Sequence, residues 1–253
     1  MSEYRFMNQL IEKEHIPTPA YVFDLDKMKE FAEKVKRSLT GKAEICYAMK
    51  ANPFLIKPML EIVSSLEVCS PGEFRICERA GIPMEKIVLS GVYKNPDDIA
   101  YMLDRYGNSG TYTVESLQHL KVLNDTAVRH GIILSVLIRV TSGNQFGIDE
   151  AEIRKIISER EKYAGIEIEG IQFYSGTQKR NLSQMQEELE HLDAFIRDLE
   201  DINGMKIRTL EYGPGFFVPY FVKDKSERTE DLLGEFKKIL EALQFHGKIV
   251  LEM

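Results

Sequence analysis

The 253 residues are 43% hydrophobic and 29% charged, an ordinary globular composition with enough length for one large core. The net charge of −7, with a pI near 5.4, repels phosphate backbones and anionic lipids, so nucleic acid is not an expected partner. No stretch approaches about eighteen uninterrupted apolar residues, and residues 1–15 are charged without an apolar signal segment, so we expect a cytoplasmic protein without membrane contact.

Short β-rich runs alternate with longer helical segments along the chain, the pattern of βαβ units around a parallel sheet. Before them, Thr18–Phe23 is predicted as an extra strand with Pro19 at its edge, and Leu25–Leu39 as a helix. The eight predicted barrel strands are Glu44–Met49, Leu66–Ser70, Lys86–Ser90, Thr111–Val114, Ile132–Val140, Ile166–Phe173, Ile207–Tyr212 and Lys248–Glu252. They predict an α/β fold, one (β/α)8 TIM barrel, which at about 250 residues uses nearly the whole chain.

The segments between these runs follow helical periodicity. In one of them, apolar residues recur at three- and four-residue steps, namely Met185, Leu189, Leu192, Phe195, Ile196 and Leu199. No helical segment follows the last run before Met253, so the helix over Leu25–Leu39 is expected to close the barrel. No repeat or linker is visible, which indicates one compact domain.

Cysteine and histidine spacing gives no metal motif. The three cysteines, Cys46, Cys69 and Cys77, form no CxxC pair and lie in or beside apolar runs, which predicts buried free thiols. The five histidines lack metal-ligand spacing and lie mostly in charged helical surroundings, so surface or capping roles are expected for His15, His119, His130, His191 and His246.

Lys50 is the first candidate for chemistry, because the active site of such a barrel forms at the C-terminal ends of its strands. It follows the first run within Tyr47-Ala48-Met49-Lys50-Ala51-Asn52-Pro53. A lysine at the end of an apolar strand is desolvated, which lowers its pKa and suits covalent chemistry with a carbonyl. A lone lysine there is more often a solvated surface residue, so the surrounding string decides the interpretation.

That string resembles the cofactor-lysine motif of the diaminopimelate, ornithine and arginine decarboxylases, which are fold-type III, alanine-racemase-like enzymes that use pyridoxal 5'-phosphate. Further blocks resemble the same family in the same order along the chain. They are Thr18–Asp24, Glu67–Glu73 with Glu67 in place of the usual aspartate, Arg139 with Gln145–Gly147, Gly170–Gln178, Leu210–Phe216 and Leu251–Met253. The resemblance implies a pyridoxal-phosphate-dependent amino-acid decarboxylase, a lyase of amino-acid metabolism.

The resemblance also implies roles for individual residues, with Lys50, Tyr174 and Glu252 as the catalytic candidates. Lys50 would hold the cofactor as a Schiff base, and Glu252 would lie against the pyridine nitrogen, where a carboxylate favours the protonated ring. Tyr174 would stack on the ring where the family usually has a histidine. Glu73 and Arg139 match family positions in the polar network beneath the cofactor, although the two could equally form a structural ion pair.

The cofactor phosphate is expected at a glycine-rich loop after the seventh run, leading into a helix, where backbone N–H groups bind anions. The loop reads Gly213-Pro214-Gly215-Phe216. Since Pro214 has no N–H, the Gly215 and Phe216 amides and the Thr177 hydroxyl are the predicted ligands, with Gly213 beside them. A Gly-Pro-Gly triplet alone is usually only a turn, so this prediction depends on its place after the strand.

Several alternatives stay open. Tyr174–Gln178 and Phe216–Phe221 resemble stretches of the glutamyl-carrier-protein decarboxylases, so an amino-acyl group on a carrier protein is a candidate substrate beside a free L-amino acid. A single-barrel pyridoxal-phosphate-binding homeostasis protein without efficient turnover, or an amino-acid racemase, would share the barrel. The resemblance further implies a homodimer and a C-terminal β-domain missing from this chain, with residues 1–24 joining that β-domain and residues 25–253 forming the cofactor-binding barrel.

Overall fold

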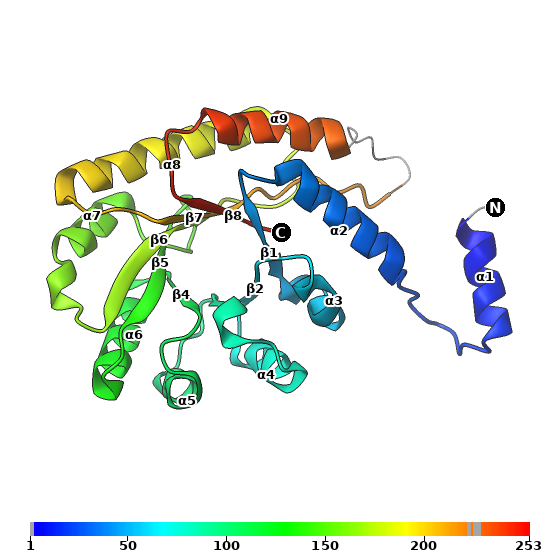
Figure 1. The fold of residues 1–253 in the computed structure, drawn as a ribbon, viewed down its shortest axis with the longest axis horizontal. Coiled ribbons are helices and arrows are strands. Elements are labelled where there is room, and N and C mark those ends of the chain that lie inside the picture. The colour runs from blue at the N-terminus through cyan, green and yellow to red at the C-terminus, as the bar shows by residue number, and fades with distance from the viewer. Residues whose placement is uncertain (1–2, 222–223, 225–228) are drawn as a thin grey trace.

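The computed structural model describes residues 3–221, 224 and 229–253. Within these residues, eight parallel strands close into a barrel in sequence order (Figure 1). They are β1 (Glu44–Ala48), β2 (Ser65–Val68), β3 (Ile87–Leu89), β4 (Thr111–Val114), β5 (Leu134–Val140), β6 (Ile166–Tyr174), β7 (Thr209–Gly213) and β8 (Lys248–Glu252). The predicted (β/α)8 barrel is confirmed, and each predicted strand overlaps an observed one.

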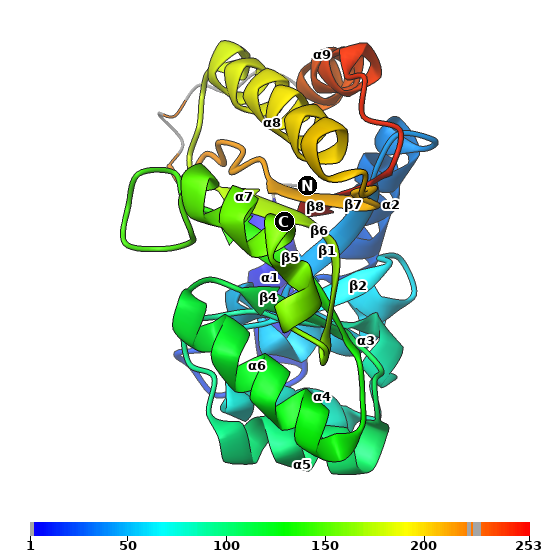
Figure 2. The ribbon, with the colours of Figure 1, turned by 90° about the vertical axis from the view of Figure 1, so that its left-hand side faces the viewer.

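Helices surround the barrel and connect its strands (Figure 2). Those in the described residues are α1 (Glu3–Lys13), α2 (Leu25–Leu39), α3 (Ile56–Leu60), α4 (Pro71–Ala80), α5 (Pro96–Tyr106), α6 (Leu117–His130), α7 (Glu150–Ser158), α8 (Leu182–Asn203) and α9 (Thr229–Ala242). Helix α2 contacts α3, β1 and α9, so it closes the ring where β1 meets β8. The prediction that the helix before the first strand closes the barrel is confirmed.

Polar side chains at the helix starts fix where the loops above the barrel end. The side chains of Ser70, Asn95, Ser116 and Asn181 each accept a backbone N–H in the first turn of α4, α5, α6 and α8. Such caps satisfy N–H groups that have no partner inside the helix, and each contributes about 1 kcal/mol. The loops that carry the candidate site residues therefore run between a strand end and a capped helix start.

The apolar face predicted for α8 packs on the barrel. Its members are at most 3% exposed and belong to the main hydrophobic cluster: Met185, Leu189, Leu192, Phe195, Ile196 and Leu199. Burying each such side chain stabilises the fold by roughly 1.5–3 kcal/mol. This packing fixes α8 on the barrel, and α8 connects β6 to β7, the two strands whose ends carry Tyr174 and Gly213.

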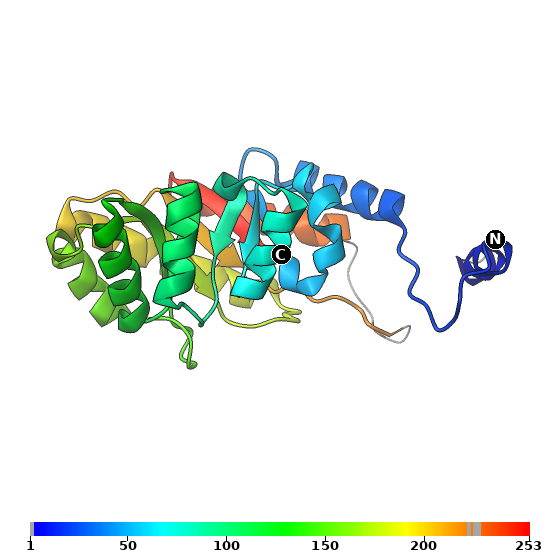
Figure 3. The ribbon, with the colours of Figure 1, turned by 90° about the horizontal axis from the view of Figure 1, so that it is seen from below.

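The segment before α2 differs from the prediction. Thr18–Phe23 forms no strand, and Tyr21 is fully exposed. The partner that the resemblance implies for this segment is a β-domain, and each of the eight described barrel strands already has two neighbours. Figure 3 shows α1 standing apart from the barrel, joined to it through this extended segment. In the part of the chain that the structure describes, no helix is long and apolar enough to span a membrane.

Candidate active site

Lys50 and two glutamates meet at the C-terminal ends of neighbouring strands. Strand β1 pairs with both β2 and β8, which brings Glu67 on β2 and Glu252 on β8 to either side of the turn that follows β1. Lys50 lies in that turn, and its Nζ donates to Glu67 Oε2 at 2.6 Å and to Glu252 Oε1 at 3.0 Å. Residues from both ends of the barrel sequence thus form one charged cluster.

The protonation of this cluster differs from the sequence-based expectation. Burial alone lowers the pKa of Lys50, but the charges of Glu67 and Glu252 outweigh it, so the pKa is raised above its ordinary value. The prediction of a lowered pKa is wrong for this arrangement. Burial and the charge of Glu67 raise the pKa of Glu252, whereas hydrogen bonds from Glu252 and Lys50 outweigh burial and lower the pKa of Glu67. Glu67 is therefore the carboxylate that pairs with Lys50, and Glu252 is the acid that tends to keep its proton.

Cys69 lies beside the cluster, with its Sγ 3.7 Å from Lys50 Nζ. The prediction of buried free thiols is confirmed for Cys46 and Cys77. Cys69 is also free but only half-buried, because it follows β2 at the open mouth of the barrel. Burial raises the pKa of its thiol, and the charge of Glu67 raises it further, so the thiol stays protonated near neutral pH.

Glu73 lies at the start of α4. Its Oε2 accepts the Cys69 N–H at 2.7 Å, and its own N–H donates to Ser70 Oγ at 3.2 Å. This reciprocal pattern resembles a capping box, which fixes how the chain enters the helix. Glu73 thereby holds the loop that carries Cys69. The alternative of an ion pair between Glu73 and Arg139 is wrong, because Arg139 has another partner.

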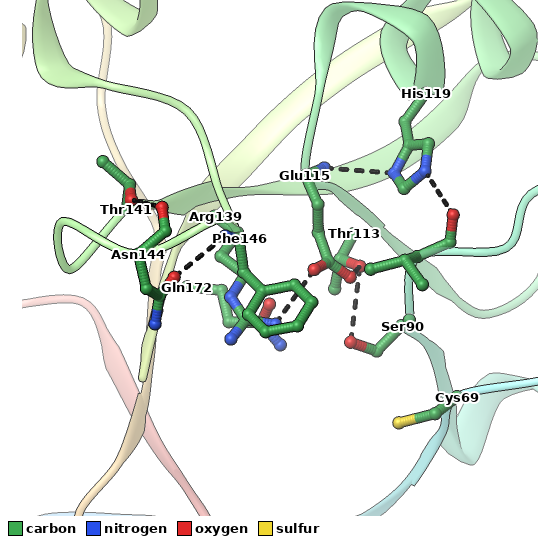
Figure 4. Close-up of polar contacts among 12 residues, drawn as sticks. Cys69, Ser90, Thr113, Glu115, His119, Arg139, Thr141, Asn144, Phe146 and Gln172 are labelled. Carbon is green, nitrogen blue, oxygen red and sulfur yellow. Dashed lines mark hydrogen bonds and ion pairs between the residues drawn. The ribbon is translucent and has the colours of Figure 1, made fainter. Parts of the chain in front are cut away.

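That partner is Glu115, which follows β4 (Figure 4). Arg139 on β5 donates from Nη1 to Glu115 Oε2 at 2.9 Å, and the two side chains are 14% and 2% exposed. The Phe146 ring, which belongs to the loop after β5, has its centroid 5.4 Å from the guanidinium carbon. The sequence-based reading missed Glu115, although an acid directly after a predicted strand was the available signal.

Two further buried groups line the same mouth. The Glu115 N–H donates to His119 Nδ1 at 3.3 Å, and His119 Nε2 lies 2.9 Å from the Val92 carbonyl oxygen, so Nε2 carries the proton (Figure 4). Burial lowers the pKa of His119, and the neutral ring ties the loop after β3 to α6. Of the two roles expected for this histidine, the surface position is wrong, whereas its bond from the Glu115 N–H just before α6 agrees with a capping role. Lys94 donates to the Gly91 carbonyl at 2.8 Å, and burial lowers its pKa to about 8.

Tyr174 and Gly213 end β6 and β7 and are paired in the sheet register. A Cβ at position 213 would lie 2.6 Å from Tyr174 Cδ2, so only glycine lets the ring lie against this strand. Gly215 has a φ of 60°, and a Cβ there would lie 2.0 Å from the Gly176 carbonyl oxygen. The loops after β6 and β7 therefore pack against each other at backbone distance.

These two loops present unpaired donors that fit an anion. The Lys179 N–H donates to the Gly215 carbonyl at 2.8 Å, which fixes one loop on the other. In the described parts of the chain, the N–H groups of Gly215 and Phe216 and the Thr177 hydroxyl have no hydrogen-bond partner. Two amides and a hydroxyl suit the phosphate of the expected cofactor. The prediction that the glycine loop leads into a helix is wrong, since α9 begins only at Thr229.

Deeper in the barrel lies a buried amide and carboxyl pair that the sequence-based reading also missed. Gln172 Nε2 donates to Glu211 Oε1 at 2.6 Å, and both residues are at most 2% exposed. Burial raises the pKa of Glu211 to about 7. A charge at this position is costly because little solvent reaches it.

Glu211→Gln is expected to stabilise the protein at pH 8 and to change its stability little at pH 4.5. The pKa of Glu211 rises from 4.5 to about 7 on folding. Between these values the folded state holds a proton that the unfolded state has released, so stability falls as the pH rises through this window. Above it, the buried charge costs on the order of 3 kcal/mol, which the variant avoids while its Oε1 still accepts from Gln172.

Urea unfolding of both proteins at pH 4.5 and pH 8 measures this difference. Glu44→Gln, at an exposed position of β1, is the matched control and should show no such pH dependence. A stability difference between Glu211→Gln and the unchanged protein that is equal at both pH values would contradict the assignment of the proton to Glu211.

The chain matches known proteins along the whole barrel. The family model described as pyridoxal-dependent decarboxylase, pyridoxal binding domain, matches residues 25–252. Diaminopimelate decarboxylase from Aquifex aeolicus is 31% identical over 252 residues, covering 93% of this chain and 59% of that protein. The L-glutamyl acyl-carrier-protein decarboxylase from Niallia circulans is 24% identical over 227 residues, covering 83% and 52%.

A solved structure gives the same result. Diaminopimelate decarboxylase from Helicobacter pylori, in complex with L-lysine, matches with a TM-score of 0.84 and 27% identity over 99% of this chain and 65% of that one. The chain thus spans 52% to 65% of the length of these relatives. The family resemblance read from the sequence is confirmed, and the cofactor of this family is pyridoxal phosphate. Because the family model runs from α2 to β8, this chain belongs to the pyridoxal-dependent decarboxylases and forms their pyridoxal-binding domain.

Proposed function

We propose that this protein is a pyridoxal-5'-phosphate-dependent amino-acid decarboxylase in which Lys50 binds the cofactor. The observation that carries the proposal is the meeting of Lys50, Glu67 and Glu252 at the barrel mouth of a chain of this family. When bound, the cofactor supplies an aldehyde that reacts with amines and a ring that accepts the electrons left by departing CO₂.

The residues around Lys50 would control its proton and that of the cofactor. Glu67 accepts a hydrogen bond from the Lys50 ammonium at 2.6 Å, and its charge keeps on this amine the proton that must leave before the amine reacts with a carbonyl. Burial raises the pKa of Glu252, and we assign this residue to the ring nitrogen of the cofactor, to which the acid would give its proton and beside which it would stay as the carboxylate that favours the protonated ring. Tyr174 offers the aromatic face for stacking at the end of β6.

The remaining candidate residues lie at the other strand ends and in the loops that follow them. Gly213, Gly215, Phe216 and Thr177 are proposed to hold the phosphate through the unpaired donors of the two packed loops. Arg139 lies in the neighbouring network, where it is held by Glu115. Glu73 would act on the site indirectly, because its carboxylate holds the loop that carries Cys69.

The substrate has two candidate forms. Diaminopimelate decarboxylases among the relatives favour a free amino acid. Tyr174, in place of the usual histidine, and the relative from Niallia circulans favour an amino-acyl group carried on an acyl carrier protein. We further propose that the protein is cytoplasmic and that it forms a homodimer, the latter as the resemblance implies. We also propose that residues 1–24 join a β-domain and that residues 25–253 form the cofactor-binding barrel.

The test is CO₂ release at cofactor saturation, measured by mass spectrometry. We expect release from either diaminopimelate, another L-amino acid, or an L-glutamyl group on an acyl carrier protein, and the active arm identifies the substrate class. Bound cofactor without CO₂ release from any arm would overturn the decarboxylase proposal and favour a binding protein. Inversion of the α-carbon, detected by chiral chromatography, would favour a racemase.

A further inference from the structure

Glu188 is a nearly buried carboxylate on α8 that accepts several hydrogen bonds. Ser175 Oγ donates to its Oε1 at 2.6 Å, while Lys179 Nζ and Tyr212 Oη donate to its Oε2, each at 2.6 Å. Gln184 Nε2 donates to Oε1 at 3.1 Å. The Glu188 side chain is 13% exposed and that of Lys179 is 4% exposed. Short hydrogen bonds to a charged carboxylate are strong where little solvent reaches them, so they hold the donor side chains in place.

Three of the donors come from the loop after β6 and from the end of β7, next to the unpaired amides and hydroxyl. Ser175 and Lys179 lie on either side of Thr177, in the loop after β6. Tyr212 immediately precedes Gly213 on β7. One carboxylate on α8 therefore ties the loop after β6 and the end of β7 to a helix whose apolar face is fixed on the barrel.

The backbone of Lys179 adds a second tie at the same place. Its N–H donates to the Gly215 carbonyl at 2.8 Å, and its carbonyl accepts the Phe217 N–H at 3.0 Å. The ammonium of Lys179 pairs with Glu188. This buried ion pair fixes Lys179, whose backbone joins the two loops. Burial raises the pKa of Glu188, but hydrogen bonds from Lys179, Ser175 and Tyr212 outweigh it and lower the pKa, which keeps the acceptor ionised.

We propose that Glu188 is a positioning residue that sets the spacing between Thr177 and the amides of Gly215 and Phe216, and so the affinity for the cofactor phosphate. This inference rests on the proposed function, because it takes these donors as the phosphate ligands. Glu188 does not touch the phosphate itself, and its effect passes through Ser175, Lys179 and Tyr212.

The test compares two ligands that differ only in the phosphate. Dissociation constants of Glu188→Ala for pyridoxal 5'-phosphate and for pyridoxal are measured by equilibrium dialysis. We expect the variant to bind the phosphate ester roughly tenfold more weakly, because Thr177 and the two amides are no longer held at one spacing, and to bind pyridoxal as the unchanged protein does. Glu187→Ala, an exposed glutamate one residue earlier on α8, is the matched control and should leave both constants unchanged.

A second variant separates positioning from folding. Glu188→Ala leaves the Lys179 ammonium buried without its carboxylate, which can destabilise the fold. The double variant Lys179→Met with Glu188→Leu removes both charges, and a thermal melt shows whether it is folded. We expect the folded double variant to keep the weakened binding of the phosphate ester.

Each outcome has a distinct meaning. If the folded double variant binds pyridoxal 5'-phosphate as tightly as the unchanged protein does, the role of Glu188 is overturned, but the proposed function is not. An equal loss of affinity for both ligands would also overturn this role, because the effect would not act through the phosphate. Failure of the unchanged protein to bind either ligand would overturn the proposed function, and this inference with it.

Discussion

Replacing Lys50 with alanine is expected to remove the visible absorption band of the cofactor-loaded protein and to lower CO₂ release by more than about a thousandfold. Lys50 supplies the amine that the proposed chemistry requires, and it is placed at the barrel mouth by Glu67 and Glu252. The measurement is an absorption spectrum at saturating pyridoxal phosphate, followed by the CO₂ assay. Lys50→Arg provides the matched control, because it keeps the positive charge beside both glutamates but offers no comparable nucleophile.

Lys94 is the other lysine at the barrel mouth that could bind the cofactor. Burial lowers its pKa to about 8, whereas the pKa of Lys50 is raised, so Lys94 loses its proton more readily in this arrangement. Its amine, however, donates to the Gly91 carbonyl and the Thr113 hydroxyl, whereas the amine of Lys50 donates to Glu67 and Glu252. Borohydride reduction and peptide mapping should place the pyridoxyl group on Lys50. A label on Lys94, or an unchanged band in Lys50→Ala, would contradict the assignment.

The barrel could be predicted from the sequence because its signals are local. Each strand is an apolar run bounded by turn residues, and α8 shows its packed face as a periodic row of apolar residues. The strand over Thr18–Phe23 was predicted from the same kind of local signal, but a strand also needs a partner edge. The resemblance implies that this edge lies in a β-domain, and the closed barrel offers no other edge among the described residues, so Thr18–Phe23 is not a strand there.

The candidate site could be predicted only in part, for a related reason. Lys50 and Glu252 were found because each stands at the end of a predicted strand, in a string that resembles the family's. Their contact, and the proton that Glu252 keeps, follow from β1 pairing with β8 in the closed barrel, which no local pattern encodes. Glu188 was missed for the same reason, since it lies on a helix and acts on two loops.

Replacing Arg139 with methionine is expected to destabilise the protein by about 3–5 kcal/mol. The Glu115 side chain is 2% exposed and accepts from Arg139 at 2.9 Å, so loss of the guanidinium leaves a buried carboxylate without its main counter-charge. Thr113, at 3.4 Å, offers only a long hydrogen bond in compensation. The measurement is the free energy of unfolding in urea at pH 7, without cofactor.

A matched control and a double variant show whether the loss of stability in Arg139→Met comes from the buried ion pair. Arg208→Met removes an arginine that is 49% exposed and paired with Glu167 and Glu169, so it should cost only about 1 kcal/mol. The double variant Arg139→Met with Glu115→Met should regain most of the stability, because apolar residues often replace a buried ion pair without loss. If Arg139→Met keeps its stability but binds pyridoxal phosphate weakly, the ion pair is not structural. Arg139 would then act on the cofactor, as the family resemblance implies, with Glu115 holding it in place.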